Sequence, residues 1–144
     1  MRYILLLLMV LGFANCKKDN KPEGPLNITL YNKTPKVIYT YLKGKWKFVY
    51  GKGGLNANQM HYCDGCTLEF TNDGRIITNT FFKANAIISW QKEKGIFTNG
   101  DSTYIMYFLD DSNVPEFFEM DGIFNDTLVF HDYSMDAIFY HFIK

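Results

Sequence analysis

Three residues near the middle of the chain have the types and spacing that could do chemistry. His61, Cys63 and Cys66 form an H-x-C-x-x-C cluster within "HYCDGC". The Asp64-Gly65 pair between the cysteines favours a turn, which brings the two Cα atoms within the roughly 7 Å that a disulfide allows. We therefore predict a disulfide between Cys63 and Cys66 if the chain is exported to an oxidising compartment.

Two other chemistries fit the same residues. His61 and two thiolates would give an open zinc site three ligands, but a structural zinc site needs four and a second half-site is missing. A redox-active pair needs a thiolate at a helix N-terminus, whereas this motif runs directly into the strand-like "TLEF". Metal binding by His61, Cys63 and Cys66 stays a weaker alternative, and we predict no other metal site. We expect His131 and His141 to be partly exposed strand residues.

The remaining polar residues do not indicate catalysis. Asp110, Asp111, Asn113 and Glu116 form an oxygen-rich loop, but it lacks the alternate-residue spacing and the glycine of a calcium loop, and it is typical of a solvated turn. The chain has no glycine-rich phosphate loop and no nucleophile elbow. We predict that the protein is not an enzyme and holds no cofactor.

The third cysteine, Cys16, follows a segment typical of an export signal. Arg2 precedes an apolar run from residue 4 to residue 11, and Gly12 and Ala14 are small. The run is shorter than the roughly 20 apolar residues that a membrane-spanning helix needs. Residues 1–15 are therefore predicted to be a signal peptide.

The stretch "FANCKKDN" resembles the cleavage region of Gram-negative lipoproteins, in which the cysteine is acylated and becomes the first residue. Phe13 and Asn15 stand where that pattern usually has Leu and a small residue, so cleavage after Ala14 with simple secretion is an alternative. The resemblance implies acyl chains such as palmitate on Cys16, and each buried methylene would contribute about 0.8 kcal/mol to membrane anchoring. Lys17 implies sorting to the outer membrane, so we expect a lipid-anchored protein of the cell envelope, on the periplasmic face or the cell surface.

The rest of the chain has the size and composition of one folded domain. Hydrophobic residues make up 47% of the sequence and aromatic residues 17%, which excludes a disordered body. The net charge is zero, and no basic patch with interleaved aromatic residues indicates a nucleic-acid partner. Residues 16–33, rich in Pro, Asn and Lys, are predicted to be a lipidated N-terminus and flexible tether, although "LNITLY" within them could pair as a strand. Residues 34–144 are the predicted domain.

A short helix is predicted at residues 35–43. Thr34 suits the N-cap, Pro35 suits the first helical position, and Gly44 suits the residue after the helix ends. The apolar residues of this segment repeat at helical spacing: Val37, Ile38, Tyr41 and Leu42.

After Gly44 the chain alternates between apolar and polar residues, as strands do. Turn signals at 72–74 and 99–100 separate some of these segments. The predicted strands are 45–52, 66–71, 75–81, 86–92, 102–109, 116–121, 127–131 and 137–143. Short connections make consecutive strands antiparallel, and closure would remove apolar edges. The sequence therefore predicts an all-β fold, an eight- or nine-stranded antiparallel meander closed as a barrel, with a short N-terminal helix.

Several motifs resemble the lipocalin-like domain of small Gram-negative bacterial lipoproteins. They are Gly44-x-Trp46 at the first strand, "LEFTNDGRI" at 68–76, "NDTLVFHD" at 125–132 and the closing "IFYHFIK". The resemblance covers residues 34–144 and implies a lipocalin-like barrel with a ligand-binding habit. Lipocalins often place an Arg over the Trp; no Arg follows Arg75 here, and Lys144 is the available substitute, without the planar surface of a guanidinium.

A barrel of this size is wide enough either to be filled by side chains or to hold one small ligand. We expect the protein to bind a small hydrophobic ligand. The alternative is an envelope interaction or accessory protein with a filled barrel, which acts through its outer surface on a protein partner. An open cavity would favour the first function, and a filled interior with an exposed apolar patch the second. The residues predicted to point inward and form the candidate pocket are Trp46, Phe48, Tyr50, Leu68, Phe70, Trp90, Met106, Phe118, Phe130 and Phe139.

Overall fold

The computed structural model describes residues 24–97 and 100–144, so the predicted signal peptide and Cys16 lie outside the described residues. The described part of the chain forms the helix α2 (Pro35–Leu42) and eleven strands. The strands are β1 (Ile28–Thr29), β2 (Gly44–Gly53), β3 (Met60–His61), β4 (Thr67–Phe70), β5 (Arg75–Asn79), β6 (Lys83–Ile87), β7 (Ser89–Lys94), β8 (Ser102–Leu109), β9 (Pro115–Phe124), β10 (Thr127–Asp132) and β11 (Ile138–Ile143). Within these residues, no helix is long and apolar enough to cross a bilayer.

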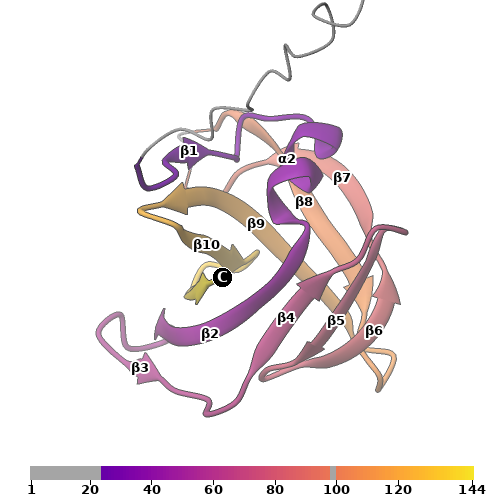
Figure 1. Cartoon of the computed structure of the whole chain (residues 1–144). Helices are drawn as coiled ribbons and strands as arrows, with labels where there is room; N and C mark the ends of the chain where they lie inside the picture. Colours follow the sequence, from indigo (N-terminus) through magenta and orange to yellow (C-terminus); the bar gives the residue numbers. More distant parts are fainter. Residues whose placement is uncertain (1–23, 98–99) are drawn as a thin grey trace, which may run out of the picture.

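The strands form one curved antiparallel sheet, which makes a half-barrel (Figure 1). Its main path runs in the order β6-β5-β4-β2-β11-β10-β9-β8-β7, and the short strands β1 and β3 pair with β9 and β2. Apart from the junction of β2 with β11 and the insertion of β3, neighbours on this path follow one another along the chain. The mostly β, antiparallel architecture with a short helix near its start is therefore as predicted.

The two ends of this path, β6 and β7, are consecutive segments of the chain with only Ile88 between them. The sequence predicted one strand at 86–92. Instead, the strand bends at Ile88, whose N–H donates to the carbonyl oxygen of Gly74 (2.9 Å). β6 pairs with β5, and β7 pairs with β8. The N–H of Asp111, in the turn after β8, also donates to the carbonyl oxygen of Lys83 (2.8 Å), which ties β6 to the far end of the sheet.

The helix α2 forms where its sequence pattern predicts it. Ile38 and Leu42 are fully buried, one helical turn apart, whereas Val37 is exposed. The indole N–H of Trp46 donates to the carbonyl oxygen of Leu42 (2.6 Å), so the helix is fixed to the start of β2. The ammonium group of Lys144 lies 4.7 Å from the centroid of the Trp46 ring, where the resemblance implied a cation.

Part of the predicted tether belongs to the folded domain. β1 pairs with β9, and Leu30 is fully buried. The N–H of Leu30 donates to the carbonyl oxygen of Asp121 (2.8 Å), and the N–H of Leu26 donates to a carboxylate oxygen of Asp126 (2.8 Å). Gly122 makes this pairing possible, because a Cβ at that position would collide with the backbone of β1. The ordered domain thus includes Leu26 and does not begin at residue 34.

Candidate functional site

Large side chains fill the concave side of the half-barrel. Seven of the ten residues predicted to point inward are buried in this core: Trp46, Phe48, Leu68, Phe70, Met106, Phe118 and Phe130. The ring centroid of Phe118 lies 5.4 Å from that of Phe130 and 4.9 Å from that of Phe82. Separations of this size are direct packing contacts between aromatic rings. A barrel of this size could be filled by side chains or hold one small ligand, and here side chains fill the concave side.

The other three residues predicted to line an inner pocket lie elsewhere. The predicted inward position of Tyr50 is wrong because β2 carries a bulge. Phe48 pairs with Phe142 and Tyr50 pairs with the preceding residue of β11, His141, so Val49 is an additional residue in β2. After this residue, the side chains that would have pointed inward point outward. The Tyr50 ring stacks on His141, 4.2 Å between centroids, on the outer face. Phe139 lies two residues from His141 on β11 and therefore also faces outward. Trp90 is opposite Met106 and packs against the core, but at its margin and only partly buried.

A groove of about 540 Å³ lies on the outer face of β10 and β11. Val129 and Phe139 line it from these strands, and Phe97 lines it from the connection between β7 and β8. Leu55 and Met135, from the β2–β3 and β10–β11 connections, also line the groove, and they are 93% and 85% exposed. The two exposed side chains extend the apolar surface of the groove.

Polar residues complete the lining of this outer groove. Lys52, Asp136 and His141 contribute an ammonium group, a carboxylate and an imidazole to it. Burial lowers the pKa of His141, and the nearby charge of Lys52 lowers it further, although the carboxylate of Asp121 acts in the opposite direction. His141 is therefore neutral at neutral pH, which leaves Lys52 and Asp136 as opposite charges at the groove.

A buried ionic cluster lies behind the aromatic lining of the groove. The ring of His131 is fully buried and packs against the rings of Phe97 and Phe139, with centroids 5.0 Å and 4.8 Å away. Its Nδ1 lies 3.0 Å from a carboxylate oxygen of Asp121, and its Nε2 lies 3.5 Å from Oε2 of Glu119. Glu119 is itself buried.

Burial alone would lower the pKa of His131, because the imidazolium loses its hydration. The hydrogen bond to Asp121 and the negative charges of Asp121 and Glu119 outweigh burial and raise the pKa of His131 to about 9. At neutral pH the ring is therefore a cation, which is unsuited to act as a general base. We interpret the cluster as a support that holds β9 and β10 beneath the groove.

Two polar atoms of this buried ionic cluster lack a hydrogen bond. Oε2 of Glu119 accepts a hydrogen bond from the N–H of Ile96 (3.1 Å), which ties the β7–β8 connection to the sheet. Oε1 of Glu119 and Nε2 of His131 have no hydrogen-bond partner among the described residues. The expectation that His131 would be a partly exposed strand residue is wrong, because Phe97 and Phe139 cover it.

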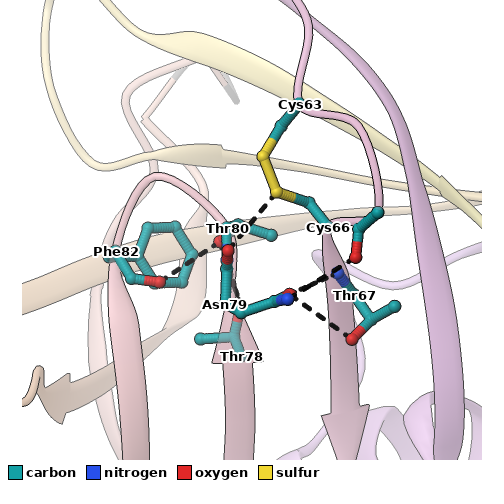
Figure 2. Close-up of a disulfide and its surroundings, with 8 residues drawn as sticks. Cys63, Cys66, Thr67, Thr78, Asn79, Thr80 and Phe82 are labelled. Carbon is teal, nitrogen blue, oxygen red and sulfur yellow. Dashed lines mark hydrogen bonds between the residues drawn. A yellow bond between two sulfur atoms is a disulfide. The ribbon is translucent and has the colours of Figure 1, made fainter.

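Cys63 and Cys66 are joined by a disulfide with Cα atoms 5.5 Å apart, as the turn between them predicted (Figure 2). Oδ1 of Asn79 accepts a hydrogen bond from the N–H of Thr67 (2.7 Å), so the disulfide turn is held against the end of β5. The ring of His61 lies beside the carbonyl oxygen of Gly53 (3.3 Å). The weaker alternative of a metal on His61 and the two cysteines would require both thiolates, which the disulfide consumes.

The oxygen-rich loop after β8 is a hydrogen-bonded turn. One carboxylate oxygen of Asp110 accepts hydrogen bonds from the N–H groups of Ser112 (2.8 Å) and Val114 (2.7 Å). Asn113 adopts a positive φ of 61°, which Asn tolerates in turns. Across residues 24–97 and 100–144, no group of three or more His, Cys, Asp or Glu side chains is arranged to hold a metal ion.

No family model, curated protein or solved structure matches this chain. The function is therefore inferred from the filled interior, the outer groove and the N-terminal sequence. The outer groove is the strongest candidate site, because it combines a volume of about 540 Å³, within the roughly 300–1,000 Å³ of small-molecule pockets, with the highly exposed apolar side chains of Leu55 and Met135.

Proposed function

We propose that the half-barrel is a closed, lipocalin-like barrel in which the bent strand formed by β6 and β7 completes the ring. The support comes from connectivity: the two ends of the sheet path are consecutive in the chain, and β2 pairs with β11. Counting β6 and β7 as one strand reduces the nine strands of the path to eight, the number found in lipocalin barrels. The cation of Lys144 over Trp46 also fits this family resemblance.

We further propose that the protein is a lipoprotein of the cell envelope, anchored in the outer membrane by acyl chains on Cys16. In this proposal it binds a small hydrophobic ligand in the outer groove of β10 and β11, and not inside the barrel. The observation that carries the proposal is the contrast between the two sides of the sheet. The concave side is packed with aromatic rings, whereas the outer side has an apolar groove that opens to solvent.

The groove offers a ligand both apolar area and rings. Phe97 and Phe139, whose centroids are 5.5 Å apart, present aromatic surface. Leu55 and Met135 would lose their exposure to water on binding, and complete burial of such a side chain contributes about 1.5–3 kcal/mol. Partial covering of both side chains, together with contact with the two rings, would therefore favour the binding of an apolar probe.

The test uses N-phenyl-naphthylamine, an apolar dye that fluoresces on leaving water. We expect the purified chain to bind it, and the Leu55→Asp/Met135→Asp double variant to bind at least about tenfold more weakly, equivalent to about 1.4 kcal/mol. Because both side chains are highly exposed, the variant is expected to fold normally. The matched control is Tyr62→Asp/Ile87→Asp, which places the same two charges on side chains that are 70% and 67% exposed and lie outside this groove.

A second probe distinguishes binding in the outer groove from binding inside the barrel. Dibrominated stearate quenches tryptophan fluorescence only on contact, and Trp46 is buried in the filled core. We expect the stearate to displace the dye without quenching Trp46. Quenching of Trp46 together with unaltered dye binding by the double variant would place the ligand inside the barrel and refute the outer site.

A protein partner is the alternative that a filled interior with an exposed apolar patch was expected to favour, and the exposure of Leu55 and Met135 suits the apolar centre of a protein interface. We rank it second because the groove beside these side chains is concave and has the volume of a small-molecule pocket. If a protein is the partner, the dye would fail to bind. Site-specific photo-crosslinking from position 55 in intact cells would then yield one discrete envelope protein, and the Met135→Asp substitution would abolish the product.

A further inference from the structure

β7 has an edge that no other strand covers within the described residues. It is the last strand of the sheet path and pairs only with β8. The N–H of Gly95 donates to the carbonyl oxygen of Asp101 (2.9 Å), in register with the β7–β8 ladder. Because backbone groups alternate along an antiparallel strand, the odd-numbered residues of β7 face β8 and the even-numbered residues face away.

Two residues of β7 therefore present unused backbone groups. Ile88, just before the strand, donates its N–H to Gly74, and the carbonyl oxygen of Lys94 accepts a hydrogen bond from the Tyr133 hydroxyl (2.6 Å). Between them, the N–H and C=O groups of Trp90 and Lys92 have no partner among residues 24–97 and 100–144. These four groups could pair with one added strand.

The open edge starts beside a groove of about 500 Å³ that is lined by residues of β7 and of the helix α2. Trp90 lines one side of this α2–β7 groove, and Lys36, Tyr39 and Lys43 line it from the helix segment. A strand edge that faces a helix across a groove is the arrangement in which proteins bind extended peptides by strand addition. The partly buried Trp90 ring would pack against an apolar side chain of such a peptide.

The charges around this groove select for an acidic peptide. Lys36 and Lys43 line it, and Lys92 and Lys94 lie on the same face of β7 as Trp90, because alternate residues of a strand share a face. Glu93 lies on the opposite face. The turn between β4 and β5 lines the groove with Asn72 and Gly74 and carries one carboxylate, Asp73. The hydrogen bond from the Thr71 hydroxyl lowers the pKa of Asp73 and keeps it ionised, so four lysines stand against this one carboxylate and Glu93.

Lysines on an edge strand normally discourage pairing with another apolar strand. Here the same charges would favour a strand that carries carboxylates. We propose that the α2–β7 groove binds an extended acidic segment of a partner protein, which adds as a strand to the open edge of β7. The chain's own residues 17–23, "KKDNKPE", carry three Lys against one Asp and one Glu, so they do not match the charge of the groove. This site is separate from the outer groove and does not depend on its function.

The test measures fluorescence anisotropy with the full chain and two labelled octapeptides. One alternates Glu with Val, and the other has Lys in place of Glu. We expect the Glu peptide to bind and the Lys peptide to bind at least about tenfold more weakly. One exposed ion pair changes the affinity only a few-fold, so reversing the charge of two lysines is expected to weaken binding of the Glu peptide by about tenfold. The variant is Lys36→Glu/Lys43→Glu, and the control is Lys45→Glu/Lys47→Glu, which makes the same charge change at exposed positions of β2.

Backbone methylation tests strand addition directly. Only alternate amides of an added strand would bond to β7, so N-methylation of one alternate set should abolish binding while methylation of the other set is tolerated. The proposal is overturned by equal binding of the two peptides, by equal effects of the two methylation patterns, or by no binding of the Glu peptide at millimolar concentration. Self-association of the chain that Lys36→Glu/Lys43→Glu abolishes would also overturn it, because the occupant would then be a second copy.

Discussion

The buried cluster of His131, Glu119 and Asp121 predicts how the free energy of unfolding depends on pH. An unfolded histidine has a pKa of 6.5, and the two carboxylates raise that of folded His131 to about 9. The folded-state pKa is above the unfolded one, so the stabilisation is complete below pH 6.5 and is lost as the pH rises through 9. The difference of about 2.5 pH units, at about 1.36 kcal/mol per unit, gives a loss of about 3 kcal/mol.

The measurement is urea unfolding, followed by tryptophan fluorescence, in half-unit steps across this pH range. His141 should contribute little there, because burial lowers its pKa below the unfolded value of 6.5. The His141→Gln control is therefore expected to keep the full slope. The Glu119→Gln variant removes one of the two carboxylates, so the pKa of His131 falls and the loss of stability between pH 6.5 and 9 becomes smaller.

His131→Gln cannot bind the proton and should show no dependence on pH in this window, although it leaves Glu119 buried without a cation, which costs about 3–5 kcal/mol. If that variant does not fold, Glu119→Gln still decides the question. A wild-type stability that stays flat from pH 6.5 to 9, or a slope that Glu119→Gln leaves unchanged, would refute the charged state that we assign to His131.

Three further outcomes are expected. Palmitate labelling in the native cell should mark the wild-type protein and not Cys16→Ser, and labelling of the variant would contradict the anchor. Intact-mass measurement should find the mature domain two mass units lighter than its reduced form, and Cys63→Ser/Cys66→Ser should lower the free energy of unfolding by about 2 kcal/mol, since the closed loop is short. Removing the cation over Trp46 with Lys144→Met should cost about 0.5–1 kcal/mol in urea unfolding, and Lys144→Arg should restore it; an equal loss in both variants would argue against a cation–π contact.

The elements that depend on local sequence could be predicted closely. α2 ends at Leu42, one residue before the predicted end, because its proline, apolar spacing and following glycine are all encoded within ten residues. β8 has the predicted bounds of 102–109. Alternation also correctly placed most of the buried rings, because it holds wherever a strand is regular.

The errors arise where a strand is irregular. The additional residue in β2 between Phe48 and Tyr50 is recognisable only once the register with β11 is known, and it moves Tyr50 to the outer face. A second bulge lies on β9, where Met120 and Gly122 pair with consecutive residues of β10. It leaves Asp121 without a partner residue on β10, and the side chain of Asp121 turns toward His131. Two carboxylates on one predicted strand, Glu119 and Asp121, and a histidine on the next could have predicted the ionic cluster. The burial of His131 could not have been predicted, because the ring of Phe97 that covers it comes from the connection between β7 and β8.

The junction of β2 with β11 has a consequence for biosynthesis. The first long strand of the domain, β2, can pair with its second neighbour only after the residues of β11 have been synthesised. Until then, one side of an apolar strand stays available to other polypeptides, which is a hazard for aggregation. The nascent chain should therefore need a holding chaperone between the synthesis of β2 and the synthesis of β11.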